Sequence, residues 1–138
     1  MKSIMCFSFV LATLSVYSQS SNAKIFFIRN TGPSLSKFKV FIDNNVVCKL
    51  PQRRYSIHEV SPGKHSFTVQ QSGMKARKRA RKKAVTVDCE AGKTYYVNLV
   101  LREQYRRRSQ HLYCEEITEN SWGKLYADLP VQENCRVK

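Results

Sequence analysis

The sequence is poor in acidic residues and lacks the motifs of catalysis. Ten Asp and Glu stand against 24 Lys and Arg, which gives the chain a formal net charge of +14. It contains no nucleophile elbow, phosphate-binding loop or metal-binding helix. The nearest catalytic candidates fall on different expected strands and turns: His58, His65, His111, Glu59, Asp88 and Glu90. We therefore expect a protein that is not an enzyme, uses no cofactor and associates with anionic partners.

The chain also lacks an apolar run long enough for a permanent transmembrane helix. Its longest apolar stretch, residues 4–17, falls short of the roughly 20 residues that crossing a bilayer requires. The stretch follows Lys2 and precedes small residues, which is typical of a cleavable signal peptide. We expect residues 1–23 to be this signal, with cleavage after Ser18 or Ala23, and the mature protein to be secreted or periplasmic. An uncleaved anchor or a buried first strand is the alternative.

Cysteines at metal-binding spacing are missing as well. No C-x-x-C pair occurs and the histidines do not fall at ligand spacing, so we expect no metal site. Once Cys6 leaves with the signal, four cysteines remain, an even number that indicates two disulfides in an oxidising compartment. Three pairings are possible, and free buried thiols are the alternative. Cys48 and Cys89 share the inward-facing parity of their expected strands, so we predict the pairs Cys48–Cys89 and, by default, Cys114–Cys135.

Apolar residues recur at every second position through most of the chain. Residues 24–30 are apolar on both faces, as in a central strand, whereas residues 37–43 alternate. Turn signals such as Asn44-Asn45 and Pro62-Gly63 separate these from further short strands at 46–50, 55–60, 65–70, 85–89, 94–101 and 111–117. The pattern predicts an all-β fold, a single antiparallel β-sandwich of seven or eight short strands.

The end of the chain breaks this alternation. Thr118 is suited to cap a short C-terminal helix that continues through Ala127. We place the sandwich domain at residues 24–128 and a C-terminal tail at 129–138. Within the domain, residues 72–83 are expected to form a basic loop between two strands.

Two turn motifs resemble those of a bacterial envelope family. Val60-Ser61-Pro62-Gly63-Lys64-His65 follows a short strand, and Ala91-Gly92-Lys93-Thr94-Tyr95-Tyr96-Val97 precedes an apolar one. They are similar to the "PGxH" and "GxxYY" turns of the domain-of-unknown-function family 2846, whose style resembles that of PEGA-type β-sandwiches. The resemblance covers residues 24–127 and implies a β-sandwich at the cell envelope with no active site to carry over. Unlike many relatives, the chain has no lipid-accepting cysteine, and its long basic loop is an addition to the family pattern.

The basic loop is the strongest functional candidate. Seven of the nine residues from 75 to 83 are basic, and a second cluster follows at 106–108. A helical wheel of the run is charged nearly all round, so no face could be buried. Aromatic residues are missing from it, which argues against base stacking and sequence-specific recognition of nucleic acid. The candidate polyanion-binding residues are Lys75, Arg77, Lys78, Arg79, Arg81, Lys82, Lys83, Arg106, Arg107 and Arg108.

Two classes of function fit these features. In the first, a non-catalytic sandwich binds an anionic polymer or lipid surface, such as lipopolysaccharide, acidic polysaccharide or a phosphate backbone. In the second, a structural or protein-interaction module docks its basic loop on an acidic partner protein. A solvated loop tip without a function is the simpler alternative to both.

Overall fold

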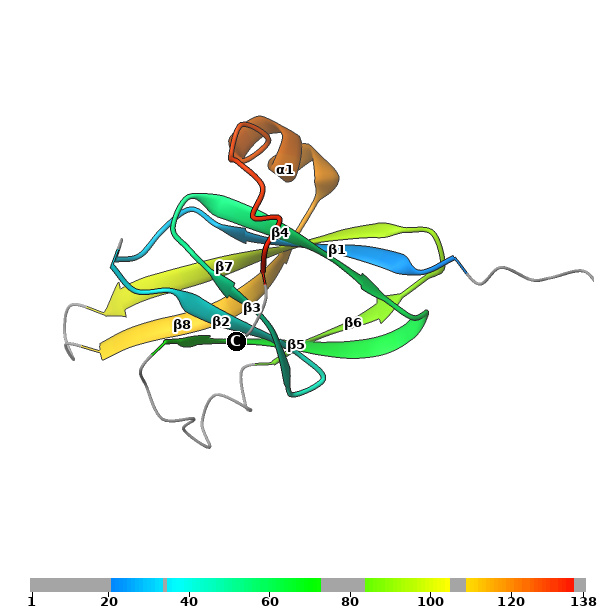
Figure 1. Cartoon of the computed structure of the whole chain (residues 1–138), viewed down its shortest axis with the longest axis horizontal. Helices are drawn as coiled ribbons and strands as arrows, with labels where there is room; N and C mark the ends of the chain where they lie inside the picture. The colour runs from blue at the N-terminus through cyan, green and yellow to red at the C-terminus, as the bar shows by residue number, and fades with distance from the viewer. Residues whose placement is uncertain (1–20, 34, 73–83, 105–108, 136–138) are drawn as a thin grey trace, which may run out of the picture.

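The computed structural model describes residues 21–33, 35–72, 84–104 and 109–135, which form two packed β-sheets (Figure 1). Eight strands and one helix follow one another in this part of the chain. They are β1 (Ala23–Arg29), β2 (Phe38–Ile42), β3 (Asn45–Leu50), β4 (Arg54–Val60), β5 (Gly63–Gln71), β6 (Val85–Cys89), β7 (Thr94–Gln104), β8 (Ser109–Ile117) and α1 (Glu119–Leu125).

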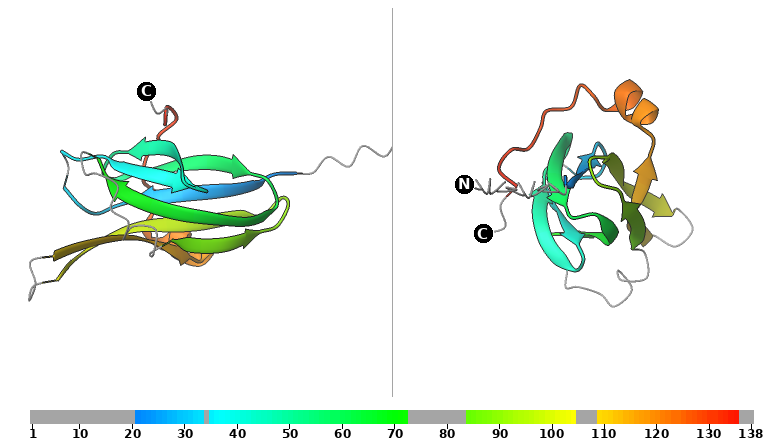
Figure 2. Two further views of the ribbon diagram at one scale, coloured as in Figure 1. Left: turned by 90° about the horizontal axis from the view of Figure 1, so that it is seen from below. Right: turned by 90° about the vertical axis from the view of Figure 1, so that its right-hand side faces the viewer.

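Each sheet has four strands. The order is β4-β1-β7-β8 in sheet A and β3-β2-β5-β6 in sheet B. Neighbouring strands are antiparallel except β1 and β7, which are parallel. The views in Figure 2 show the two sheets face to face. The predicted all-β sandwich with a short C-terminal helix is confirmed, with one parallel pair inside sheet A.

Alternating apolar side chains fill the space between the sheets, because strand residues two apart share a face. On β2, Phe38, Val40 and Ile42 are buried while Lys39 and Phe41 are partly exposed. The parities predicted for residues 85–89 and 94–101 are confirmed as well. Other members of the core are Ile25, Phe27, Leu50, Phe67, Val69, Val87, Val97 and Leu99, together with Cys48, Cys89 and Cys114.

The hairpin between β2 and β3 turns at Asp43 and Asn44, one residue before the predicted Asn44-Asn45 turn. Both residues have positive φ, 49° and 67°, a conformation that Asp and Asn adopt more readily than most residues. The Asp43 carboxylate accepts a hydrogen bond from the Ser66 N–H at 2.9 Å, which ties the turn to β5.

A second apolar layer covers the outer face of sheet A. Trp122 of α1 stacks on Tyr96 with 5.5 Å between ring centroids, and it meets Tyr55 and Phe26 edge-on at 4.8 and 5.4 Å. Because Phe26 faces this layer while Phe27 faces the core, β1 is apolar on both faces, as the sequence predicts for a central strand.

The helix begins and ends close to the predicted residues. The Thr118 side chain accepts a hydrogen bond from the Ser121 N–H, so Thr118 is the N-cap. The helix ends at Leu125, two residues before the predicted end at Ala127. In the described ranges α1 is the only helix, and its seven residues are too few to cross a membrane.

Residues 129–135, which belong to the predicted C-terminal tail, are attached to the sandwich. Val131 pairs with Tyr55 of β4 in parallel, and the Gln132 N–H donates to the Tyr55 carbonyl at 2.7 Å. Cys135 is disulfide-bonded to Cys48 of β3. Figure 2 shows this segment running from α1 to the side of the sandwich where β3 and β4 lie. It therefore covers part of the edge of sheet A and ties that edge to sheet B.

Arg29, the last residue of β1, is fully buried. Its guanidinium donates to the carbonyls of Ser36, Leu50 and Pro33 at 2.6, 2.8 and 2.7 Å. It also lies over the Phe38 ring, 3.6 Å from the centroid. Burial lowers the pKa of Arg29 to about 10, so the group stays protonated at neutral pH. One charged side chain thus joins the β1–β2 connection to the end of β3.

Candidate functional site at the loop end

The strands β1, β3, β5 and β7 all end at one end of the sandwich, on the left of Figure 1. We call this the loop end. Phe38, the first residue of β2, pairs with both Leu50 and Gln71, so β3 and β5 end on either side of the start of β2. β7 runs parallel to β1 and continues past it to Gln104. The strand ends that precede residues 73–83 and 105–108 therefore lie at this same end, although the two segments are far apart in the sequence.

The predicted polyanion-binding residues themselves lie outside the described residues. This holds for the seven between 75 and 83 and for the three at 106–108. The described chain does fix the point from which the first segment starts. The Ser72 N–H donates to the Lys37 carbonyl at 2.8 Å, so the residue before this segment is held against the chain entering β2.

Four described basic residues belong to the strands and turns at this end of the sandwich. Lys39 of β2 lies opposite Lys49 of β3, and residues so placed on antiparallel strands have Cβ atoms about 4.5 to 5.5 Å apart. Lys37 precedes Lys39 by two residues, and Arg53 lies in the turn after β3; both are exposed. We call Lys37, Lys39, Lys49 and Arg53 the basic patch. Because like charges directly opposite one another destabilise a sheet, the Lys39–Lys49 pair favours a bound anion.

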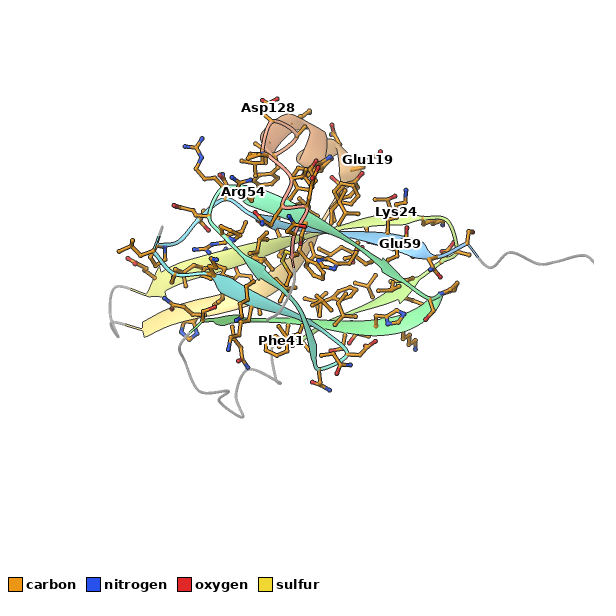
Figure 3. The ribbon with its side chains drawn as sticks, in the orientation of Figure 1. Lys24, Phe41, Arg54, Glu59, Glu119 and Asp128 are labelled. Carbon is orange, nitrogen blue, oxygen red and sulfur yellow. A yellow bond between two sulfur atoms is a disulfide. The ribbon has the colours of Figure 1, made fainter. Side chains whose placement is uncertain are left out.

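The face that carries Lys39 and Lys49 is the outer face of sheet B. Figure 3 shows Phe41, which shares this face of β2, on the side of the sandwich opposite α1. Sequence reasoning missed the basic patch because a hairpin separates its lysines, and only the strand register brings them together. The alternation within residues 37–43 did place Lys39 on the solvent side, which was the available signal.

Acidic residues are prominent at the other end of the sandwich. Asp43 lies in the β2–β3 turn, Asp88 is opposite Lys64, and Glu90 forms an ion pair with Lys93. Figure 3 shows Arg54 toward the loop end, and Lys24 and Glu59, which face each other across β1 and β4, toward the opposite end. Charge is thus distributed unevenly along the molecule.

His65 at this opposite end is held in its protonated form. Its Nδ1 lies 2.6 Å from the Asp43 carboxylate and its Nε2 lies 2.7 Å from the Ser61 carbonyl. Both partners are acceptors, so both nitrogens donate, which requires the imidazolium. The hydrogen bond with Asp43 raises the pKa of His65. The pKa of Asp43 is lowered mainly by the hydrogen bond from the Ser66 N–H, and further by the hydrogen bond with His65. An imidazolium without a free nitrogen is no general base, and the pair instead stabilises the turn.

This pair predicts a pH window of stability. The Asp43 contribution is present above its unfolded pKa of 3.8 and is lost as the pH falls through its lower folded value. The His65 contribution is present below its unfolded pKa of 6.5 and is lost as the pH rises through its higher folded value. Because the Asp43 side chain of the pair is about half exposed to solvent, which screens the interaction, we expect a loss of at most about 1 kcal/mol when His65 deprotonates.

Urea unfolding at a series of pH values checks this expectation. The difference in unfolding free energy between the parent and His65→Gln should be largest between pH 3.8 and 6.5, the unfolded pKa values of Asp43 and His65. It should shrink as the pH rises above 6.5. A difference that stays constant from mildly acidic to alkaline pH would show that the His65 charge contributes nothing.

The predicted disulfide pairing is wrong. Cys48 is bonded to Cys135, with 4.6 Å between their Cα atoms, while Cys89 and Cys114 are free and buried. Cys48 and Cys89 both face the core, as predicted. However, β3 and β6 are the two edges of sheet B, three strand spacings or about 14 Å apart, which is beyond the reach of a disulfide. Cys114 on β8 is likewise at the edge of sheet A farthest from residues 129–135.

The two free cysteines, Cys89 and Cys114, are expected to be poor nucleophiles. Burial raises the pKa of the Cys114 thiol to about 12 and also raises that of Cys89. Both groups are therefore thiols at neutral pH, whereas the nucleophilic form of cysteine is the thiolate. They serve as small apolar residues of the core.

The comparison with known families agrees with the resemblance carried by the two turn motifs. Residues 19–110 match the family described as "Protein of unknown function (DUF2846)". The match spans more than half of the chain and includes both basic segments, whereas α1 and Cys135 follow it. Searches among curated proteins and among solved structures found no match. The likeness to PEGA-type sandwiches stays a prediction. The chain belongs to the DUF2846 family of proteins of unknown function.

Proposed function

We propose that this protein is a non-catalytic sandwich that binds an anionic polymer or lipid surface through its loop end. The observation that carries the proposal is the partly exposed Lys39–Lys49 pair beside Lys37, whose carbonyl accepts a hydrogen bond from the Ser72 N–H. The run of seven basic residues follows Ser72 within a few residues along the chain. The basic patch and the run therefore belong to one region of the surface.

Repulsion between the basic residues of this region favours the binding of a polyanion. Clustered cations repel one another and raise the free energy of the unbound protein, and a polyanion removes that repulsion. It also releases counterions, so binding weakens as salt is added. The net charge of +14 provides long-range attraction to the same partners.

One structural feature supports a secreted or periplasmic location, and another bears on where a signal peptide would be cleaved. The Cys48–Cys135 disulfide is compatible with an oxidising compartment. Ala23 is fully buried and pairs with Val60. We therefore place the expected signal-peptide cleavage after Ser18, because cleavage after Ala23 would remove a core residue of β1.

Heparin binding at several salt concentrations tests the proposal. On a duplex polyanion such as DNA, seven phosphate contacts by the basic residues of the run should make log K fall against log salt with a slope of about −6. Changing Lys78, Arg79, Arg81 and Lys82 to Ser should weaken binding at low salt about 100-fold or more, since each cation near an anionic surface contributes about 1 kcal/mol. Changing Lys39 and Lys49 to Gln should cost about 10- to 30-fold by the same reasoning.

A matched control separates a local site from diffuse attraction. Changing Lys24 and Lys64 to Gln removes two charges from the opposite end and should leave heparin affinity within about 3-fold of the parent. Equal losses in the two double variants would contradict a site at the loop end. Binding that saturates with one acidic protein and ignores heparin, lipopolysaccharide and anionic vesicles would instead support the protein-interaction alternative.

A further inference from the structure

A cluster of possible metal ligands lies at the edge where β3, β4 and the C-terminal segment meet. Cys48 of β3, His58 of β4 and Cys135 of the C-terminal segment each bring one ligand atom within 4.8 Å of the other two. Cys48 is fully buried, and the other two are partly buried. Their spacing along the sequence gives no hint of the cluster, because three separate elements supply the ligands.

The position of His58 supports a role toward the sulfur atoms. His58 shares the inward face of β4 with Ser56 and Val60, both buried, and its ring lies against Phe27 at 5.6 Å between centroids. Its Nε2 is 3.0 Å from the Ser56 hydroxyl. A ring that is held by a neighbouring hydroxyl and has a nitrogen within 4.8 Å of two cysteine sulfurs resembles zinc sites, where a second group orients the ligating imidazole.

In the disulfide the two sulfurs are bonded to each other, so a metal site requires reduction first. A dithiol reductant transfers two electrons and two protons to the disulfide and is itself oxidised to a disulfide, which leaves thiols on Cys48 and Cys135. A zinc ion then replaces the two thiol protons. Two thiolates cancel the charge of Zn²⁺, which suits a partly buried site.

Zinc binding requires the two sulfur atoms to move apart once their bond is broken. Zinc binds sulfur at about 2.3 Å and nitrogen at about 2.0 to 2.1 Å, so tetrahedral ligand atoms lie on the order of 3.5 to 3.8 Å apart. The three atoms already lie within 4.8 Å of one another. Cys135 belongs to the C-terminal segment, which is tied to β4 mainly through Tyr55, so its sulfur can separate from that of Cys48.

We propose that reduction of the Cys48–Cys135 disulfide converts this edge into a three-ligand zinc site made by Cys48, His58 and Cys135. The fourth position is left for water or an external ligand, as in zinc sites with three protein ligands. Bound zinc would take over the attachment of the C-terminal segment to β3 when the disulfide is open. This site is independent of the basic patch and of polyanion binding.

Cobalt spectroscopy on the full mature protein tests the site. A Cys89→Ala, Cys114→Ala background removes the other thiols, and a phosphine reductant opens the disulfide and is oxidised to its oxide by taking oxygen from water. The reduced protein should bind one Co²⁺ with the charge-transfer absorption of thiolate ligands and the visible bands of four-coordinate cobalt. Zn²⁺ should displace the cobalt, and the unreduced protein should give no such spectrum.

The His58→Gln variant is the decisive comparison, with His65→Gln at the opposite end as its matched control. His58→Gln should weaken Co²⁺ binding at least 10-fold, while His65→Gln should bind as the parent does. Zn²⁺ should also raise the melting temperature of the reduced parent but not of reduced His58→Gln, with Trp122 fluorescence reporting that each variant is folded. Equal Co²⁺ affinity and spectra in the parent and His58→Gln, or no thiolate charge-transfer band after reduction, would overturn the proposal.

Discussion

Replacing Arg29 with methionine should lower the free energy of unfolding by about 3 to 5 kcal/mol. The guanidinium is fully buried and satisfies the carbonyls of Ser36, Leu50 and Pro33 at 2.6 to 2.8 Å. Methionine fills much of the same volume but leaves these acceptors without their donor, and each buried unsatisfied group costs about 1 to 3 kcal/mol. Guanidinium chloride unfolding of the parent and the variant measures the difference.

Two comparison variants identify which property of Arg29 matters. Arg29→Lys keeps the charge but loses the planar fork of donors, so it should recover less than half of the lost stability. Arg102→Met removes an exposed arginine from β7 and should change the unfolding free energy by less than about 0.5 kcal/mol. If the free energy of unfolding of Arg29→Met lies within about 1 kcal/mol of that of the parent, the Arg29 side chain does not stabilise the loop end as we expect.

Changing Cys135 to serine should cost about 4 kcal/mol. The disulfide joins residues 87 positions apart, and opening a loop of that size restores a large chain entropy to the unfolded state. In a metal-free buffer, the reduced parent should unfold at the same denaturant concentration as Cys135→Ser, and reductant should not affect the variant further. A variant as stable as the oxidised parent would show that the cross-link stabilises nothing beyond the local contacts of residues 129–135.

The elements of the fold follow from local patterns in the sequence. Alternation predicts which residues of β2, β6 and β7 face the core, because the side-chain period of a strand is two. A central position for β1 follows from its apolar residues on both faces. Thr118 marks the start of α1 because a hydroxyl before a helix can accept a backbone hydrogen bond.

Local patterns do not reveal the order of the strands in a sheet, and the wrong disulfide pairing follows from that. The parity of Cys48 and Cys89 is correct, but parity does not tell how many strands separate two residues of one sheet. The Lys39–Lys49 pair and the cluster around His58 likewise depend on contacts between separate elements. Arg29 looks like the polar end of a strand in the sequence, and its burial is explained only by the four carbonyls around its guanidinium.

The place of β1 in sheet A also determines when the molecule can fold. β1 is the first strand among the described residues, yet it lies between β4 and β7 and pairs in parallel with residues 94–98. Contacts between residues so distant in sequence form slowly, because a long loop must close first. During synthesis, β1 therefore has one unpaired side until residues 94–98, about two thirds of the way along the 138 residues, have emerged. Sheet A is completed late, and folding is a property of the nearly finished chain.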